Sequence, residues 1–231
     1  MPLIPKPAAT VVLLRDGRDG PETLLVQRSP ALVFGGGAYV FPGGRVDAAD
    51  HTPFPGCTID DATASRQLGM ADGGLAYLQA AIRECFEEAG ILLAEYPNGK
   101  TLSDADLADL RDALRNGTTD LGTLLDRQGL VPSIDRLRYL ARWITPPGRP
   151  RRFDTRFFLA PAPTAQNVTV CGEETVGARW VTPKRALEDG AQGRIWLMGP
   201  TRYTLNALTG HRTLAALFRH LDEREVDFEV H

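Results

Sequence analysis

The sequence predicts an α/β fold, because short strand-like apolar segments are mixed with amphipathic helical segments along 231 residues. Hydrophobic residues make up 43% of the chain and charged residues 24%, which excludes disordered, collagen-like and coiled-coil classes. At roughly 150 residues per domain, one enlarged domain over residues 1–231 fits better than two complete ones. No apolar run approaches the roughly 20 residues of a membrane span, so no membrane partner is expected.

The first two strands are expected to form a hairpin. Residues 9–14 and 23–27 are short β-branched or apolar runs, and the segment between them, residues 15–21, is rich in turn formers. Residues 32–44 follow as a glycine-rich stretch that ends in Pro-Gly-Gly and allows tight backbone geometry. Residues 48–72 are polar and irregular, so we expect a loop there with room for one helical turn.

Three helices are predicted in the middle of the chain. Apolar residues recur at three- and four-residue spacing over residues 74–89, and Gly90 then suits a left-handed C-cap. Ser103 is a good N-cap for a second helix, which has an acidic first turn and extends to about Gly117. A third, short helix is expected over residues 119–127.

The second half of the chain returns to strand patterns. Residues 137–145 alternate in the manner of a strand, and residues 153–159 resume this pattern after a Pro-Pro-Gly break. A strand with an acidic lead-in follows at residues 173–181. A helix that begins with Thr-Pro covers residues 183–189, and a last helix is expected over residues 200–220.

The helix at residues 74–89 carries the clearest chemical signal. At about 100° per residue, Glu84, Glu87 and Glu88 fall within an arc of roughly 100°, opposite the apolar stripe. Like charges at this spacing repel by a few tenths of a kcal/mol per pair unless a cation neutralises them. Their hard oxygen ligands suit Mg²⁺ or Mn²⁺. By itself, however, such a cluster is better explained by a solvated acidic face.

A known motif covers this cluster. The segment Arg-Glu-Cys-Phe-Glu-Glu-Ala-Gly-Ile, residues 83–91, satisfies the R-E-U-x-E-E-x-G-U half of the Nudix box, and Gly44 supplies its opening glycine. The chain therefore resembles the Nudix hydrolase family. The family box runs G-x5-E-x7-R-E, whereas here the sixth residue after Gly44 is Asp50 and Arg83 lies 33 residues further on. The box is thus split by about 25 residues.

This resemblance implies a Nudix-type α/β/α sandwich with a mixed β-sheet and a helical insertion. The first insertion would cover about residues 51–73, within the box. The second would cover about residues 97–134 and contain the two helices that precede the strand at 137–145. The sequence alone leaves open whether this helical insertion is a lid or a dimer contact.

A second motif narrows the resemblance. Residues 24–44 follow the spacing L-L-T-x-R-[SA]-x3-R-x3-G-x3-F-P-G-G, which precedes the box in coenzyme A diphosphatases. Two positions depart from it, because Val26 replaces threonine and Val33 replaces arginine. With the split box, the chain looks like the acyl-CoA/coenzyme A diphosphatase branch. That branch implies hydrolysis of coenzyme A or acyl-CoA to 3′,5′-ADP and a 4′-phosphopantetheine derivative.

The resemblance also implies roles for individual residues. The implied ligands for Mg²⁺ or Mn²⁺ are Glu84, Glu87, Glu88 and a backbone carbonyl near Gly44. The implied catalytic residues are Arg83, Glu84 and Glu174. The candidate substrate-binding residues are Arg28 and Arg152. Arg83 would hold a glutamate in place by a charge-assisted hydrogen bond. The general base would be Glu84 or Glu174, and Glu173 competes with Glu174 for that position.

Several alternatives stay open. Within the family, NADH or ADP-ribose could replace coenzyme A as substrate, and a non-catalytic nucleotide-sensing module is a further alternative. The net charge of −3, from 26 basic and 29 acidic residues, gives no sign of a nucleic-acid partner and disfavours an RNA-decapping role. Three cysteines without a CxxC pair favour a reducing cytoplasm. A homodimer remains an alternative to a monomer.

Overall fold

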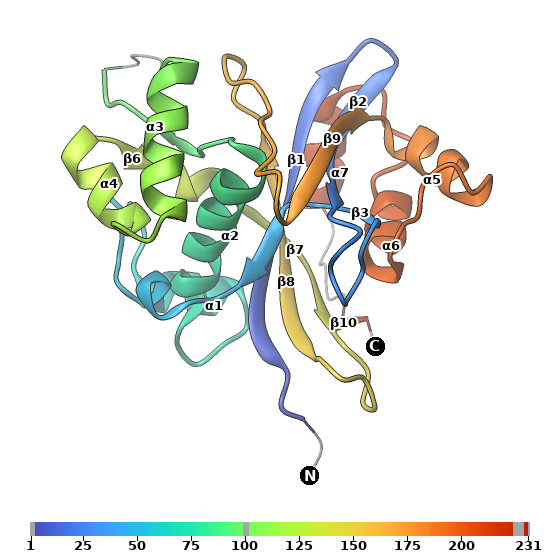
Figure 1. Ribbon diagram of the computed structural model, residues 1–231, viewed down its shortest axis with the longest axis horizontal. Coiled ribbons are helices and arrows are strands. Elements are labelled where there is room, and N and C mark those ends of the chain that lie inside the picture. Colours follow the sequence, from blue (N-terminus) through green and yellow to red (C-terminus); the bar gives the residue numbers. More distant parts are fainter. Residues whose placement is uncertain (1–2, 99–101, 224–228, 231) are drawn as a thin grey trace.

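A mixed β-sheet lies between two layers of helices in the computed structural model (Figure 1). The structure describes residues 3–98, 102–223 and 229–230. Within them, the main sheet has the order β10-β7-β8-β1-β2-β3, with β4 paired to β1 and β9 paired to β2. Its strands are β1 (Lys6–Gly17), β2 (Gly20–Arg28), β3 (Tyr39–Val40), β4 (Gly43–Arg45), β7 (Arg138–Ile144), β8 (Phe153–Pro161), β9 (Thr175–Val181) and β10 (Glu229–Val230). β1 is antiparallel to β2, which confirms the predicted hairpin, and parallel to β8.

The helices cover both faces of this sheet. One layer contains α1 (Asp61–Gln67), α2 (Gly74–Ala89), α3 (Asp104–Arg115) and α4 (Leu121–Gln128), and the other contains α5 (Pro183–Ala191), α6 (Gly199–Ala207) and α7 (Leu214–Asp222) (Figure 1). Side chains alternate between the two faces of a strand. Accordingly, Ala9, Val11 and Leu13 of β1 join the core beneath α2, whereas Val12 and Leu14 join the core beneath α5–α7. The predicted α/β/α sandwich with a mixed sheet is confirmed.

Two predicted elements have the wrong extent. Residues 48–72 contain more helix than one turn, since a 3-10 helix, η1 (Ala48–His51), precedes the seven-residue α1. The single helix expected over residues 200–220 is two helices, because Gly210 adopts φ +90° between α6 and α7 and Thr213 then caps α7. The two- and three-residue strands β3 and β4 were also missed. No helix in the described ranges has the length and apolar character needed to cross a membrane.

The two expected insertions lie on the same side of the sheet and touch one another. β5 (Ala94–Glu95) pairs with β6 (Val131–Pro132) and closes the base of the helical insertion. Phe54 of the first insertion lies against Gly122 of α4, where an added Cβ would come within 3.3 Å of the Phe54 ring. The helical insertion thus packs against the first insertion as well as against α2.

The N-terminus of α2 is capped by α1. The Asp61 carboxylate accepts hydrogen bonds from the backbone N–H groups of Gly73 and Leu75, both at 2.9 Å, and the Ser65 hydroxyl accepts one from Gly74, also at 2.9 Å. These are donors that a helix leaves without intrahelical partners. An added Cβ at Gly74 would overlap the backbone of Ser65, so only glycine allows this close approach.

We predict that Asp61→Asn destabilises the protein by about 1 kcal/mol at neutral pH, as loss of a helix cap does. The N–H groups of Leu75 and Gly73 hold the pKa of Asp61 below its ordinary value. The stability that the charged carboxylate contributes is therefore present above its unfolded pKa of about 3.9 and is lost as the pH falls through the lower folded pKa. Urea unfolding at pH 7 and pH 3 should show the difference from wild type shrinking in acid.

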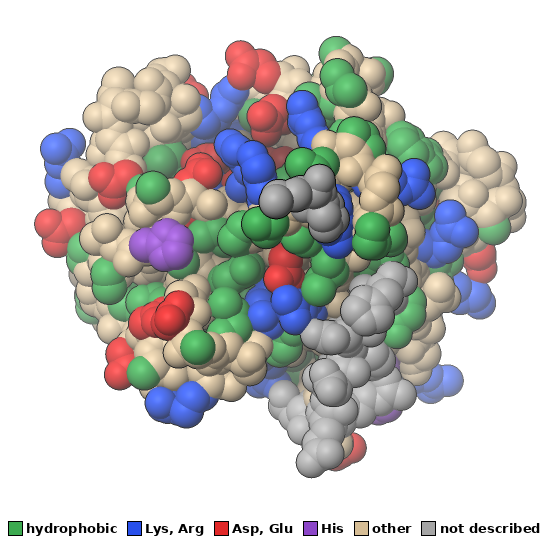
Figure 2. Space-filling view, turned by 90° about the horizontal axis from the view of Figure 1, so that it is seen from below, with side chains coloured by type: hydrophobic (Ala, Val, Ile, Leu, Met, Phe, Trp, Pro, Cys, Tyr) green, Lys and Arg blue, Asp and Glu red, His purple; other side chains and the backbone are tan. Residues whose placement is uncertain are grey.

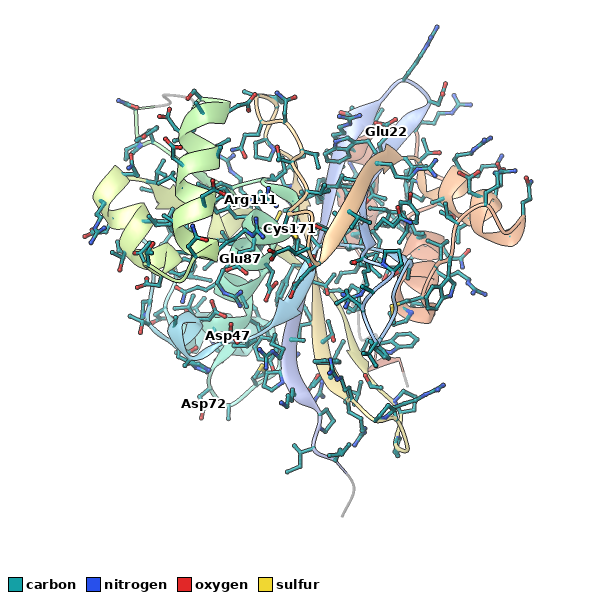
Figure 3. The ribbon with its side chains drawn as sticks, viewed as in Figure 1. Glu22, Asp47, Asp72, Glu87, Arg111 and Cys171 are labelled. Atoms are coloured by element: carbon teal, nitrogen blue, oxygen red, sulfur yellow. The ribbon has the colours of Figure 1, made fainter. Side chains whose placement is uncertain are left out.

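Asp72→Asn is the matched control, because Asp72 is exposed in the loop between α1 and α2 (Figure 3). It should change the unfolding free energy by less than about 0.5 kcal/mol. Equal effects of the two substitutions at pH 7 would contradict the cap.

Candidate active site

The glutamates of α2 are covered by protein rather than exposed to solvent. Glu84 is 9% exposed and Glu88 is 4% exposed, although α2 turns its apolar residues toward the sheet. The alternative of a solvated acidic face is therefore wrong for these two residues. Ionised carboxylates are costly to bury without compensating partners, so their surroundings need a specific account.

Arg83 joins this cluster to the start of the first insertion. Its side chain is only 8% exposed, and Nε and Nη2 donate to the two carboxylate oxygens of Asp50 at 3.0 and 2.9 Å. Nη1 donates to Glu84 at 3.0 Å and to Glu87 at 3.3 Å, and Nη2 also reaches the carbonyl of Arg45 at 2.8 Å. Asp50, whose role the split box left uncertain, is thus the bidentate partner of Arg83.

Gly43 and Gly44 of β4 lie directly against α2. The N–H of Gly43 donates to the Glu88 carboxylate at 3.0 Å. An added Cβ at Gly44 would overlap the carboxylate of Glu84, and one at Gly43 would overlap Thr10 of β1. Glycine is therefore required at both positions for β4 to fit between β1 and the glutamates.

The negative charges of the cluster are only partly compensated. Burial and the nearby charge of Glu84 raise the pKa of Glu88 to about 8, against the hydrogen bond from Gly43. Burial also raises the pKa of Glu84 to about 7, while Arg83 opposes this change. The cluster therefore favours the binding of protons or of another cation.

The described residues do not form a ready-made metal site, since no three His, Cys, Asp or Glu side chains among them are grouped as a ligand set. Glu84 and Glu87 instead accept hydrogen bonds from Arg83, and Glu88 accepts one from Gly43. The donor set still fits a hard divalent cation, because these are buried carboxylates in a cluster short of positive charge. Each of these hydrogen bonds uses one carboxylate oxygen, so the second oxygen of each glutamate could serve as a ligand.

Arg28 and Glu174 lie beside this cluster. The positive charge of Arg28, at the end of β2, lowers the pKa of Glu88, and the negative charge of Glu174 raises it. Their segments are linked, because the N–H of Ser29 donates to the carbonyl of Glu174 at 2.8 Å. The Nε of Arg28 is buried and has no hydrogen-bond partner in the described part of the chain.

Arg152 and Glu173 are placed differently. Arg152 donates to the carbonyls of Thr145, at 2.9 Å, and Leu3, at 2.6 Å, so it ties the start of β8 to neighbouring backbone. Its position gives no support to the expected contact with substrate. Glu173 pairs with Arg115 of α3 at 3.1 Å and is 83% exposed. Of the two adjacent acids, Glu174 is therefore the one whose charge acts on a glutamate of α2, namely Glu88.

Gln79 and Arg111 are two further site residues that the sequence did not predict. The Gln79 amide is fully buried, accepts from the N–H of Phe54 at 2.6 Å, and donates to the carbonyls of Asp50 and Thr52 at 2.6 and 2.9 Å. Its signal was a polar residue bordering the apolar stripe of α2 on a helical wheel. Arg111 of α3 donates to the carbonyl of Glu87, and Figure 3 shows its side chain beside the end of α2.

The fold and this site define a protein of the Nudix class. The solved structure of a Nudix hydrolase from Alicyclobacillus acidocaldarius superposes with a TM-score of 0.67 at 29% sequence identity, covering 88% of this chain and 90% of that one. A family model described as the NUDT19 Nudix domain matches residues 53–208. The chain belongs to this Nudix family.

Two curated relatives carry the name acyl-coenzyme A diphosphatase NUDT19. The human protein is 30% identical over 243 residues, and the chicken protein is 31% identical over 252 residues. These matches cover 87% and 89% of this chain. The chain spans 64% of the length of the human relative and 66% of that of the chicken relative.

We predict that Asp50→Asn lowers the free energy of unfolding by about 3–5 kcal/mol, because it leaves the buried charge of Arg83 without its main partner. Asp47→Asn is the matched control. Asp47 lies 3.8 Å from the same guanidinium but is 52% exposed, so its removal should cost about 1 kcal/mol or less. Urea unfolding of both variants measures the difference, and equal losses would refute the central role of Asp50.

Proposed function

We propose that the protein is a Mg²⁺- or Mn²⁺-dependent diphosphatase that hydrolyses coenzyme A or acyl-CoA. The observation that carries this proposal is the buried, under-compensated carboxylate cluster of α2, with Arg28 and Glu174 beside it. The names of the human and chicken relatives support the substrate class. We further propose that residues 1–231 form one Nudix domain with two insertions.

In the proposed reaction, water adds to one phosphorus and the P–O–P bridge breaks. Glu84, Glu87, Glu88 and the carbonyl near Gly44 would hold the divalent cation, which supplies charge neutralisation for the diphosphate. Glu174 or Glu84 would accept the proton of the attacking water. Arg28 would bind a phosphate oxygen through the Nε that now has no partner in the described residues.

Arg83 has a supporting role in this proposal. Its bonds to Asp50 would keep the guanidinium in place while Glu84 and Glu87 hold the cation. For coenzyme A, the products would be 3′,5′-ADP and 4′-phosphopantetheine, with the acyl group retained on the latter when acyl-CoA is the substrate.

Two features support a small-molecule substrate in a reducing compartment. Acidic and basic side chains are interspersed with hydrophobic ones on the face shown in Figure 2. Cys57, Cys85 and Cys171 are free thiols, which agrees with a cytoplasmic location. Oligomerisation, including the homodimer alternative, is a separate question for solution measurements.

The proposal is tested by incubating the purified protein with Mg²⁺ or Mn²⁺ and a panel of coenzyme A, short- and medium-chain acyl-CoA, NADH and ADP-ribose. Release of 3′,5′-ADP from coenzyme A or its esters is the expected result. Faster hydrolysis of NADH or ADP-ribose than of coenzyme A would show that the proposed substrate class is wrong. Tight binding without product would favour the nucleotide-sensing module.

We predict that Glu87→Gln and Glu88→Gln each lower kcat by about 100-fold or more, because each removes a charged oxygen ligand at the reacting diphosphate. Glu95→Gln is the control, since Glu95 pairs with Arg136 on the surface at the base of the helical insertion. Steady-state hydrolysis, with circular dichroism to verify folding, measures these effects. Near wild-type rates in folded Glu87→Gln and Glu88→Gln would remove both residues from the site.

A further inference from the structure

The C-terminal turn of α2 carries Glu87 and Glu88, and its carbonyl groups are bound by different parts of the chain. Such carbonyls have no partners within their own helix. The carbonyl of Glu88 accepts from the Thr175 hydroxyl at 2.9 Å, and that of Ala89 accepts from the N–H of Thr169 at 2.9 Å. The carbonyl of Glu87 accepts two bonds from Arg111, from Nε at 3.0 Å and from Nη2 at 2.6 Å.

Arg111 is an unusual residue for this position. It belongs to α3 of the helical insertion and is only 5% exposed. No salt bridge to a carboxylate is found for it within the described ranges, and its guanidinium instead donates to a carbonyl at the end of α2. A buried charge is costly, and α3 already packs through Leu107, Leu110 and Leu114. Docking alone therefore does not require an arginine.

We propose that Arg111 is a positioning residue, through which the helical insertion holds the last turn of α2 and so the carboxylates of Glu87 and Glu88. This inference rests on the proposed function, because it assigns those carboxylates to the metal site. The planar guanidinium uses two donors on one carbonyl, which fixes the backbone of Glu87 more tightly than a single bond would. The helical insertion would then tune affinity for the cation without contacting it.

The test compares Arg111→Met and Arg111→Lys with Arg115→Met. Arg115 lies one turn further along α3 and pairs with exposed Glu173, so it is a matched control outside the contact with α2. The readout is the Kd for Mn²⁺ of the substrate-free protein, measured by electron paramagnetic resonance of the free ion. Thermal unfolding and steady-state kinetics are recorded in parallel.

Arg111→Met should raise the Kd for Mn²⁺ about tenfold, the low end of effects seen when residues that orient ligands are removed. The same variant should lower kcat similarly, with little change in KM for coenzyme A. Arg111→Lys should fall between it and wild type, and Arg115→Met should stay within about twofold of wild type. If Arg111→Met does not fold, Arg111→Lys is judged against Arg115→Met by the same criterion.

If folded Arg111→Met binds Mn²⁺ with the Kd of the wild type, the inference is overturned. This holds even if the melting temperature of the variant falls, because Arg111 would then contribute to stability alone. This outcome leaves the proposed function intact when the unsubstituted protein binds Mn²⁺ and hydrolyses a substrate. Absence of both Mn²⁺ binding and hydrolysis in the unsubstituted protein would instead overturn the proposed function and this inference together.

Discussion

The arrangement of the candidate site depends on one buried guanidinium. Arg83 places its donors on Asp50, Glu84, Glu87 and the carbonyl of Arg45, so a single side chain connects α2, β4 and the start of the first insertion. The bidentate bond to Asp50 sets the plane of the guanidinium, and this plane determines where Glu84 and Glu87 can accept. Gln79 stabilises this arrangement, because its amide binds backbone carbonyls of the segment that carries Asp50.

The two segments that we propose as insertions satisfy opposite ends of the same helix. Asp61 and Ser65, in the first insertion, satisfy N–H groups at the start of α2. Arg111, in the second, satisfies a carbonyl at its end. A helix that carries several like charges close together is destabilised by their repulsion, and capping at both termini offsets part of that cost. The added length of the chain is therefore coupled to the part of the fold where charge is concentrated.

Much of this structure could be predicted from local patterns in the sequence, but its long-range contacts could not. The α2 helix, its Gly90 cap and the Ser103 cap of α3 follow from residues adjacent in sequence, and the structure confirms them. Asp50, the bidentate partner of Arg83, lies 33 residues away, and the partners of Gln79 lie 25 to 29 residues away, across a segment whose path no periodicity reveals. The break at Gly210 was overlooked because apolar spacing continued on both sides of it.

The site residues differ in how well the sequence predicted them, for the same physical reason. The glutamates of α2 were found because a motif fixes their spacing. Arg28 was chosen as the arginine of the coenzyme A diphosphatase motif, whereas Arg152 was chosen only as one of the arginines that flank a predicted strand. The two arginines have different surroundings in the structure. Arg28 lies close enough to Glu88 for its charge to act on that carboxylate, whereas Arg152 binds backbone carbonyls. Arg152 already gives two of its donors to backbone carbonyls, whereas Arg28 has a buried Nε without a partner in the described residues, so a phosphate oxygen would supply a hydrogen bond that Arg28 lacks. Charge alone therefore does not identify a phosphate-binding arginine, whereas an unused donor beside under-compensated carboxylates gives a physical reason to choose Arg28.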